Sequence, residues 1–144
     1  MTRIDFHTNI PDKLAYACRL TRKAYAARGK LVLLTDSAEQ ADALNAALWT
    51  VSDTDFLPHV MADDALAPHT PIIVCHDGQL GQVTLPHFDM LVNLTRTTPA
   101  NVDQFARVFE IISTDEEDAA AGRKRYVAYK QAAYPLTHFV ASKS

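Results

Sequence analysis

The chain has 144 residues, of which 48% are hydrophobic and 22% are charged, and its formal net charge is −3. These values exclude a disordered chain and are typical of a soluble globular protein, so we predict a single domain over residues 1–144. The acidic balance argues against a surface devoted to nucleic acid, because such surfaces carry an excess of Lys and Arg.

The start of the chain and its cysteines indicate the compartment. Residues Met1 to Phe6 lack the cationic segment and following apolar run of a secretory signal, and no apolar run is long enough to cross a bilayer. We therefore expect a cytoplasmic protein that does not contact a membrane. Cys18 and Cys75 lie far apart and match no metal-binding spacing, so we expect reduced, buried thiols.

Strands and helices alternate along the chain. Arg3–His7 is a candidate first strand, and Pro11 and Asp12 announce a helix that ends near Arg28. Lys30–Thr35 is a continuous apolar run, which is typical of a strand buried on both faces. Further buried strands are predicted at Pro71–Cys75, Met90–Leu94 and Val108–Ser113.

Helix starts are marked by polar residues at fixed spacing. Ser37 and Gln40 fit a capping box that opens a helix running to about Leu48. Thr114 and Glu117 have the same spacing and are predicted to open the last helix, which extends to about Ala133. A short helix is expected after Thr98 and Pro99. Irregular connections are predicted at Asp53–Pro71 and Gln79–Pro86.

This alternation predicts a fold of the α/β class. Strands that alternate with helices form a parallel or mostly parallel sheet with helices on both faces. We therefore predict a Rossmann-like three-layer α/β/α domain with a central, mostly parallel sheet, without inferring a bound dinucleotide.

The motifs of common α/β enzymes are absent. The chain has neither Gly-x-Gly-x-x-Gly nor a phosphate loop ending in Gly-Lys-Ser/Thr, and Gly78 and Gly81 fit a turn better than a nucleic-acid clamp. None of the six histidines has a partner at the spacing of a helical zinc site, so we place them at surfaces or boundaries. One catalytic alternative stays open, because Asp36 and Asp77 each follow a buried strand and two carboxylates there could hold Mg²⁺ for phosphotransfer or nuclease chemistry. The other interpretation is a helix cap at Asp36 and a turn at Asp77.

The last helix combines charge with an aromatic face. It opens with acidic residues and then turns basic at Arg123, Lys124, Arg125 and Lys130. At helical spacing Arg123, Tyr126, Val127 and Lys130 share one face, which suits an acidic peptide that ends in a carboxylate. The same charge order also complements the helix macrodipole of any solvated helix, so the pattern alone leaves both interpretations open.

The only tryptophan, Trp49, lies near the end of the second predicted helix and is followed by Phe56, Leu57 and Pro58. Large aromatics next to an irregular stretch either fill a small satellite core or anchor a partner, and tryptophan is enriched in interface hot spots. Composition does not decide between these two roles.

An ordered series of short segments resembles the chi subunit family of the bacterial DNA polymerase III holoenzyme. The series spans nearly the whole chain, although none of its motifs is specific alone. Its members are Ala15–Leu20, Val32–Asp36, Ala47–Trp49, Phe56–His59, Leu91–Leu94, Phe105–Glu110 and Arg123–Lys130.

The resemblance implies a non-catalytic accessory subunit without cofactor or metal. It implies two protein partners: a psi subunit of the clamp loader, and the acidic C-terminal tail of single-stranded DNA-binding protein. DNA would then be contacted only indirectly, at the nucleoid-associated replisome.

By position, the resemblance assigns particular residues to each partner. Arg123 and Tyr126 correspond to the tail-binding pair. Val127 stands where some relatives carry Lys, so Lys124 or Lys130 would have to supply the missing cation. The psi-facing surface would include Trp49, Phe56, Leu57 and Pro58.

Overall fold

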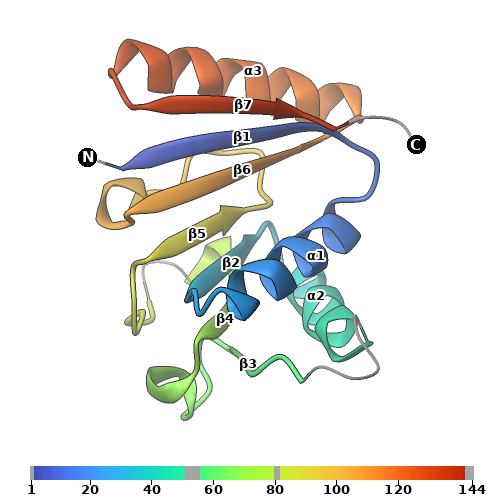
Figure 1. The fold of residues 1–144 in the computed structure, drawn as a ribbon, viewed down its shortest axis with the longest axis vertical. Coiled ribbons are helices and arrows are strands. Elements are labelled where there is room, and N and C mark those ends of the chain that lie inside the picture. Colours follow the sequence, from blue (N-terminus) through green and yellow to red (C-terminus); the bar gives the residue numbers. More distant parts are fainter. Residues whose placement is uncertain (1, 51–55, 80–81, 142–144) are drawn as a thin grey trace.

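The computed structural model describes residues 2–50, 56–79 and 82–141. Its strands form one seven-stranded sheet in the order β3-β4-β2-β5-β6-β1-β7, and every adjacent pair is parallel (Figure 1). The strands are β1 (Arg3–Ile10), β2 (Leu31–Thr35), β3 (His59–Met61), β4 (Ile72–His76), β5 (Met90–Asn93), β6 (Arg107–Ser113) and β7 (Leu136–Val140). The α-helices are α1 (Lys13–Ala26), α2 (Ala38–Thr50) and α3 (Glu116–Gln131).

The predicted buried strands form the centre of this sheet. Strand β2 lies between β4 and β5, with Leu33 in register with Val74 on one side and with Val92 on the other. All residues of β2 are buried, as its uninterrupted apolar run predicts. The Rossmann-like α/β prediction is confirmed, and the sheet is wholly parallel rather than mostly parallel.

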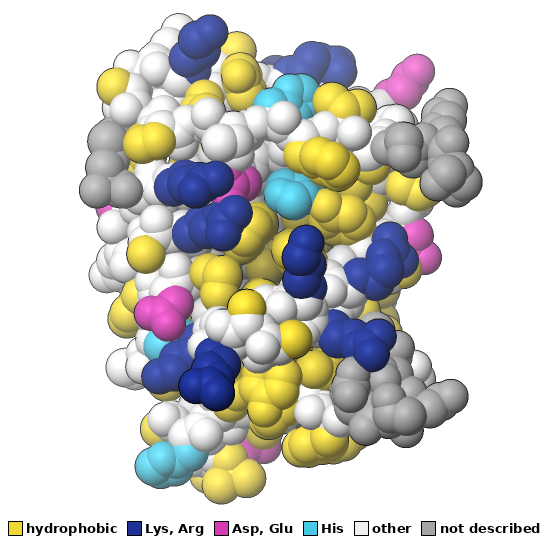
Figure 2. Space-filling model, viewed as in Figure 1, with side chains coloured by type: hydrophobic (Ala, Val, Ile, Leu, Met, Phe, Trp, Pro, Cys, Tyr) yellow, Lys and Arg dark blue, Asp and Glu magenta, His cyan; other side chains and the backbone are white. Residues whose placement is uncertain are grey.

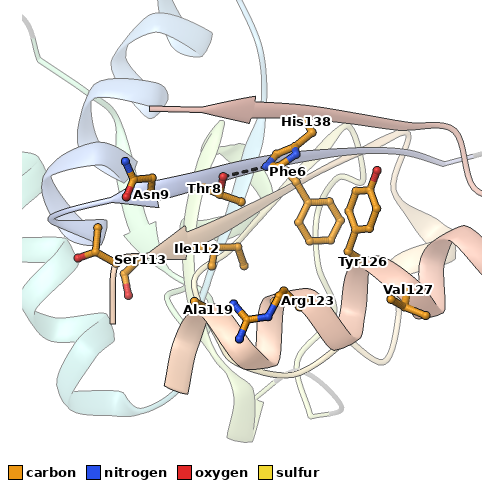
Figure 3. Close-up of a pocket in the computed structure, with 12 residues that line it drawn as sticks. Phe6, Thr8, Asn9, Ile112, Ser113, Ala119, Arg123, Tyr126, Val127 and His138 are labelled. Carbon is orange, nitrogen blue, oxygen red and sulfur yellow. Dashed lines mark hydrogen bonds between the residues drawn. The ribbon is translucent and has the colours of Figure 1, made fainter. Parts of the chain in front are cut away.

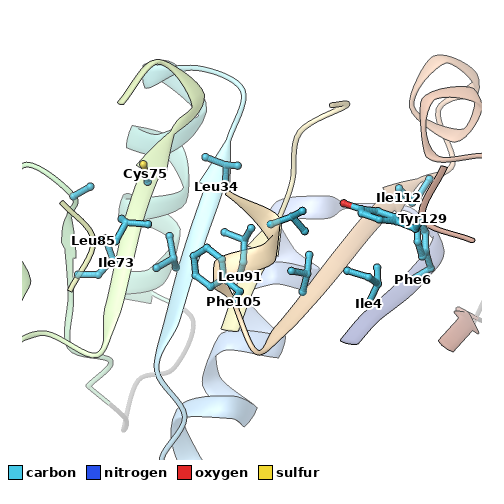
Figure 4. Packing of buried hydrophobic residues seen from close by; sticks show 14 of the residues in the cluster. Ile4, Phe6, Leu34, Ile73, Cys75, Leu85, Leu91, Phe105, Ile112 and Tyr129 are labelled. Carbon is cyan, nitrogen blue, oxygen red and sulfur yellow. The ribbon is translucent and has the colours of Figure 1, made fainter. Parts of the chain in front are cut away.

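Helices cover the two faces of the sheet unequally. Helices α1 and α2 pack on one face, where Leu33, Val74 and Phe109 join the core, and α3 packs on the opposite face against β6 and β1. The core on the α3 face runs from Ile73 and Cys75 near one edge of the sheet to Phe6 and Tyr129 near the other (Figure 4). Because α3 covers only the β6–β1 part of its face, the neighbouring edge at β7 remains open.

Two strands were not predicted. Strand β3 lies within the stretch expected to be an irregular connection, of which residues 53–55 fall outside the described residues. It has only three residues, which is too short for a periodic signal. Strand β7 is an edge strand whose side chains are mostly exposed, so it carries no buried apolar run.

The helix starts agree only in part with the sequence. The Ser37 hydroxyl accepts a hydrogen bond from the Gln40 N–H (3.2 Å), but the Gln40 side chain returns to the N–H of Asp36 (3.0 Å) rather than to Ser37. At α3 the predicted Thr114–Glu117 capping box is wrong, because Asp115 is the N-cap and accepts from the Asp118 N–H. The segment after Pro99 forms a short 3-10 turn at Val102–Gln104. In the Gln79–Pro86 connection, residues 80–81 fall outside the described residues.

The structure bears on the expectations for membrane-spanning helices, cysteines and histidines. Within the described ranges, no helix has the length and apolar character needed to span a membrane. Cys18 and Cys75 are buried as expected, in the cores on opposite faces of the sheet, and burial raises the pKa of both thiols. Most histidines are exposed or half-buried, but His59 is buried, which corrects the prediction that all of them lie at surfaces or boundaries.

A buried ion pair fixes the rotation of α3 against the sheet. The Arg125 guanidinium donates from Nε (3.2 Å) and Nη2 (3.0 Å) to Glu110 on β6, and the Tyr129 hydroxyl donates to the same carboxylate at 2.8 Å. Complete burial raises the pKa of Glu110, while attraction to Arg125 opposes that rise. Because Arg125 and Tyr129 face the sheet, Arg123, Lys124 and Val127 lie on the outward side of the helix.

Candidate functional site

A groove of about 480 Å³ separates α3 from the open edge of the sheet. Side chains from four elements line it, and Figure 3 shows them converging: Phe6 and Thr8 on β1, Ile112 on β6, Arg123, Tyr126 and Val127 on α3, and His138 on β7. The helix thus supplies one wall, and the parallel strands β6, β1 and β7 supply the floor and the other wall.

Aromatic contacts fix the floor of the groove. Tyr126 is half-buried, and its ring meets Phe6 edge-on with centroids 5.1 Å apart. The ring centroid of His138 lies 6.0 Å from that of Tyr126, and its Nε2 is 2.8 Å from the Thr8 hydroxyl (Figure 3). Tyr126 therefore presents a preset apolar surface, which loses little side-chain freedom when a ligand binds.

Arg123 gives the groove its charge. It is exposed, and within the described part of the chain its guanidinium has no ion-pair or hydrogen-bond partner. None of the described residues that line the groove is Asp or Glu, whereas Val127 extends its apolar wall and is 53% exposed. An unpaired cation beside an apolar cleft is complementary to an anion that carries a hydrophobic group.

Three of the five residues predicted on this helix line the groove. Arg123, Tyr126 and Val127 do so, whereas Lys124 and Lys130 are exposed outside its lining. Lys124 and Lys130 can act only at longer range, by adding positive potential to the exposed side of α3.

Sequence reasoning missed the rest of the lining. Phe6, Ile112 and His138 come from strands distant in sequence, and nothing in their local patterns marks them. Gly122 was the one available signal, because glycine inside a helix costs about 1 kcal/mol relative to alanine. An added Cβ at Gly122 would lie 2.8 Å from Ile112 Cδ1, so glycine permits the close approach of α3 to β6 beneath the groove.

A second exposed site lies at the far edge of the sheet. Trp49 at the end of α2 is 57% exposed and Phe56 is 65% exposed, with ring centroids 5.5 Å apart. Trp49 also contacts the ring of His59 at 4.7 Å, and His59 is held by the carbonyls of Leu57 and Asn45. The core interpretation of Trp49 is therefore wrong, and the two aromatics form one exposed apolar patch.

The residues beside this aromatic pair differ in exposure. Leu57 is only 3% exposed and packs in the core on the α1–α2 face, so its side chain cannot contact a partner protein in this conformation. Pro58 is half-buried. Trp49, Phe56 and Pro58 together are called the aromatic patch. Leu57 was assigned to the psi-facing surface from the sequence, and this is corrected because its side chain belongs to the core.

The carboxylate pair considered for Mg²⁺ gains no support. Asp36 and Asp77 follow the neighbouring strands β2 and β4, as predicted, but Asp36 is not the cap of α2, because Ser37 fills that role. Among the described residues, no group of three or more His, Cys, Asp or Glu is arranged to hold a metal ion.

Fold and sites together define a Rossmann-like α/β protein with two exposed features, a cationic groove and a pair of exposed aromatic side chains. The model of the family described as "DNA polymerase III chi subunit, HolC" matches residues 1–137, and the chain belongs to this family. It is an accessory subunit of the polymerase rather than an enzyme of its own.

Individual relatives agree with the family match. The chain is 33% identical to DNA polymerase III subunit chi of Pseudomonas aeruginosa over 94% of both chains. It is 26% identical to the subunit of the same name from Haemophilus influenzae, over 76% of this chain and 74% of that protein.

Solved structures with low identity share the fold alone. The T4 UvsW structure superposes with a TM-score of 0.73 at 10% identity, covering 97% of this chain and 41% of that one. Domain 2 of the Mss116p DEAD-box helicase gives a TM-score of 0.65 at 13% identity, over 99% of this chain and 64% of that one. The chain thus spans less than two thirds of either structure.

Proposed function

We propose that the groove between α3 and the β1–β7 edge binds the acidic C-terminal tail of single-stranded DNA-binding protein. The observation that carries the proposal is Arg123 beside the aromatic surface of Tyr126 and Phe6, with neither an ion-pair partner nor an acidic lining residue in the part of the chain that the structure describes. Such a tail ends in phenylalanine and a free carboxylate, so it offers one group for each of these features.

Arg123 and Tyr126 would divide the recognition between them. The planar guanidinium of Arg123 can donate two parallel hydrogen bonds to the terminal carboxylate or to an aspartate of the tail. The terminal phenylalanine would enter the groove against Tyr126 and Val127, where aromatic contact and burial of apolar surface both stabilise the complex. Lys124 and Lys130 would attract the acidic part of the tail from outside the groove.

The test is fluorescence anisotropy with a labelled tail peptide. Arg123→Ala removes a charge-assisted contact, which commonly costs about 1.5–3 kcal/mol. The affinity should therefore fall by roughly ten- to a hundredfold. Added salt should weaken binding, because the paired charges lie near the surface. Equal binding by the wild type and Arg123→Ala would refute the assignment of the site.

Matched controls separate this site from general electrostatics. Lys124→Ala removes the same charge one residue away, outside the groove lining, and should reduce affinity much less than Arg123→Ala. A peptide without its terminal phenylalanine should bind as poorly as one without its aspartates. Binding of a scrambled acidic peptide at full strength would reduce the interaction to nonspecific attraction.

We further propose that the aromatic patch of Trp49, Phe56 and Pro58 binds a psi-type subunit of the clamp loader. Contiguous exposed apolar patches often mark interaction sites, and tryptophan is enriched among interface hot spots. With both sites filled, the chain would tether the clamp loader to protein-coated single-stranded template, at the cytoplasmic, nucleoid-associated replisome.

The aromatic patch is tested by truncation. Trp49→Ala should weaken capture of the partner subunit by at least tenfold, since hot-spot residues contribute about 2 kcal/mol or more. Its unfolding temperature should remain nearly that of the wild type, because the ring is largely exposed. Loss of the fold in Trp49→Ala, or unchanged capture, would contradict this assignment.

A further inference from the structure

Strand β7 leaves one of its backbone edges unpaired. In the described sheet it is hydrogen-bonded only to β1, and four of its five residues, Thr137 to Val140, are exposed. Phe139 is 55% exposed and Val140 is 59% exposed. A flat, apolar free edge invites pairing with another chain, so natural proteins usually cover it or place charges on it. The sequence Leu136–Val140 contains no Asp, Glu, Lys or Arg, and its one ionisable side chain is that of His138.

The hydrogen bonds to β1 identify the backbone groups that remain free. The Ile4 N–H donates to the Pro135 carbonyl and the Ala141 N–H donates to the Thr8 carbonyl, both at 2.9 Å. Backbone groups alternate between the two sides of a strand, so residues 135, 137, 139 and 141 face β1. The N–H and C=O groups of Leu136, His138 and Val140 therefore point away from the sheet, and they can accept a further strand.

A cationic groove of about 380 Å³ lies beside this edge, on the face opposite to the α3 groove. His7, Tyr16 and Phe139 form its aromatic part, with His7 centred 5.5 Å from Tyr16 and 5.6 Å from Phe139. Its other lining residues, Arg19, Leu20 and Lys23, come from α1, and no acidic residue lines it within residues 2–50, 56–79 and 82–141. We call it the α1 groove.

The charge of α1 identifies the kind of partner. Residues 13–35 contain Lys or Arg at positions 13, 19, 22, 23, 28 and 30 and no Asp or Glu, although the whole chain has a net charge of −3. Figure 2 shows Lys and Arg side chains around hydrophobic and histidine surface on this face of the molecule. Arg19 and Lys23 are exposed at the groove, where carboxylates of a ligand would be complementary.

We propose that β7 and the α1 groove bind an extended acidic peptide segment, which adds to the sheet as a strand beyond β7. The segment would pair its backbone with Leu136, His138 and Val140, place an apolar side chain beside Phe139, and direct carboxylates to Arg19 and Lys23. Strand addition draws affinity from main-chain hydrogen bonds and specificity from flanking pockets, and both are present here. The site meets the α3 groove only at His138, whose side chain lines that groove, and it does not depend on the proposed tail binding.

Other occupants fit these features less well. A nucleic acid strand could use the cations and the rings, but it has no backbone groups to pair along a β edge. A second copy could pair β7 with β7, but that would add no carboxylates to the α1 grooves and would bring the cations of both grooves onto one joined surface.

The probe is a fluorescein-labelled peptide of about six residues that alternates glutamate with valine and carries a C-terminal amide. The amide removes the terminal carboxylate, so the probe lacks the group expected at Arg123. We expect saturable binding to the intact chain by anisotropy. Val140→Pro removes an outward N–H without removing a bond to β1 and should abolish binding, whereas Val140→Ala should retain it.

A second variant tests the charge without altering the backbone. The double substitution Arg19→Glu with Lys23→Glu should lower the affinity for the probe by roughly tenfold or more, through loss and reversal of exposed ion pairs. Arg123→Ala should leave probe binding unchanged, so failure of this proposal is distinguishable from failure at the α3 groove. Equal probe binding by Val140→Pro and Val140→Ala, both with unchanged circular dichroism, would overturn strand addition. The proposal would also be overturned by unchanged affinity in the double variant or by tighter binding of an oligothymidylate than of the peptide. A dimer that depends on β7 in sedimentation would overturn it as well.

Discussion

Two arginines two residues apart on α3 have opposite roles. Arg125 is 4% exposed and is bound to Glu110 beneath the helix, whereas Arg123 is exposed at the groove and has no ion-pair partner among the described residues. Two positions along an α-helix rotate the side chain by about 200°, so neighbours of this kind point in nearly opposite directions. The same residue type thus fixes the fold on one face and offers a charge to a ligand on the other.

The comparison shows how the groove depends on the buried face. Glu110 receives hydrogen bonds from Arg125, Tyr129 and Asn93, so α3 is held at one rotation against β6. That rotation places Tyr126 against Phe6 and leaves Arg123 at the groove. Substitutions on the buried face should therefore change stability, and substitutions on the open face should change binding alone.

The largest expected effect is on the buried face. Arg125→Met would leave the Glu110 carboxylate buried without its counter-charge, and breaking a buried pair from one side costs about 3–5 kcal/mol. The free energy of unfolding, measured by urea denaturation, should fall by that amount. Lys124→Met, at the adjacent exposed position, should change it by no more than about 0.5 kcal/mol. Similar values for the two variants would contradict the distinction between the faces.

A smaller loss is expected where α3 approaches the sheet. The Cβ of Gly122→Ala would lie 2.8 Å from Ile112 Cδ1, so the helix or Ile112 must shift. Overpacking of this kind costs about 1–3 kcal/mol, of which the better helix propensity of alanine returns about 1 kcal/mol. Ile112→Val removes the clashing Cδ1, so the alanine substitution should cost less in that background. An equal cost in both backgrounds would show that contact with Ile112 is not the cause.

The first turn of α3 should give the protein a dependence on acidic pH. Burial alone would raise the pKa of Asp118, but hydrogen bonds from the Ser113 N–H (2.6 Å) and Lys13 (2.9 Å) outweigh it and hold that pKa below its usual range. The carboxylate therefore contributes stability that is complete above its unfolded-state pKa and is lost as the pH falls through its folded-state pKa. The stability advantage of the wild type over Asp118→Asn should be constant near neutral pH and narrow below about pH 5. An advantage that grows on acidification would contradict this sign.

The smallest effect is expected on the open face. Val127→Lys adds a cation to the groove wall at a position that is already 53% exposed. An exposed ion pair contributes about 0.3–1 kcal/mol, so the affinity for the tail peptide should rise roughly two- to fivefold at low salt. The gain should vanish in high salt, and the free energy of unfolding should not change. A loss of affinity would mean that the apolar contact of Val127 with the tail outweighs the added charge.

Local sequence determined the elements whose burial is uniform. Strands β2 and β4 are continuous apolar runs buried on both faces, and such runs predict central parallel strands wherever they occur. The exposed face of α3 was also predictable, because Arg123, Tyr126 and Val127 share one side at helical spacing. Both predictions rest on residue patterns of fixed period, which can be recognised within one continuous segment of the sequence.

Tertiary structure alone decided the rest. Strand β7 exists because β1 offers it a pairing edge, and its residues form no buried apolar run that would mark a strand. The groove needs Phe6, Ile112 and His138, which approach α3 only after the sheet has formed. Composition likewise grouped Arg125 with the other basic residues of the helix, and only the position of Glu110 on β6 makes it structural. Such contacts join residues distant in sequence, and they depend on strand order and register, which local periodicity does not encode.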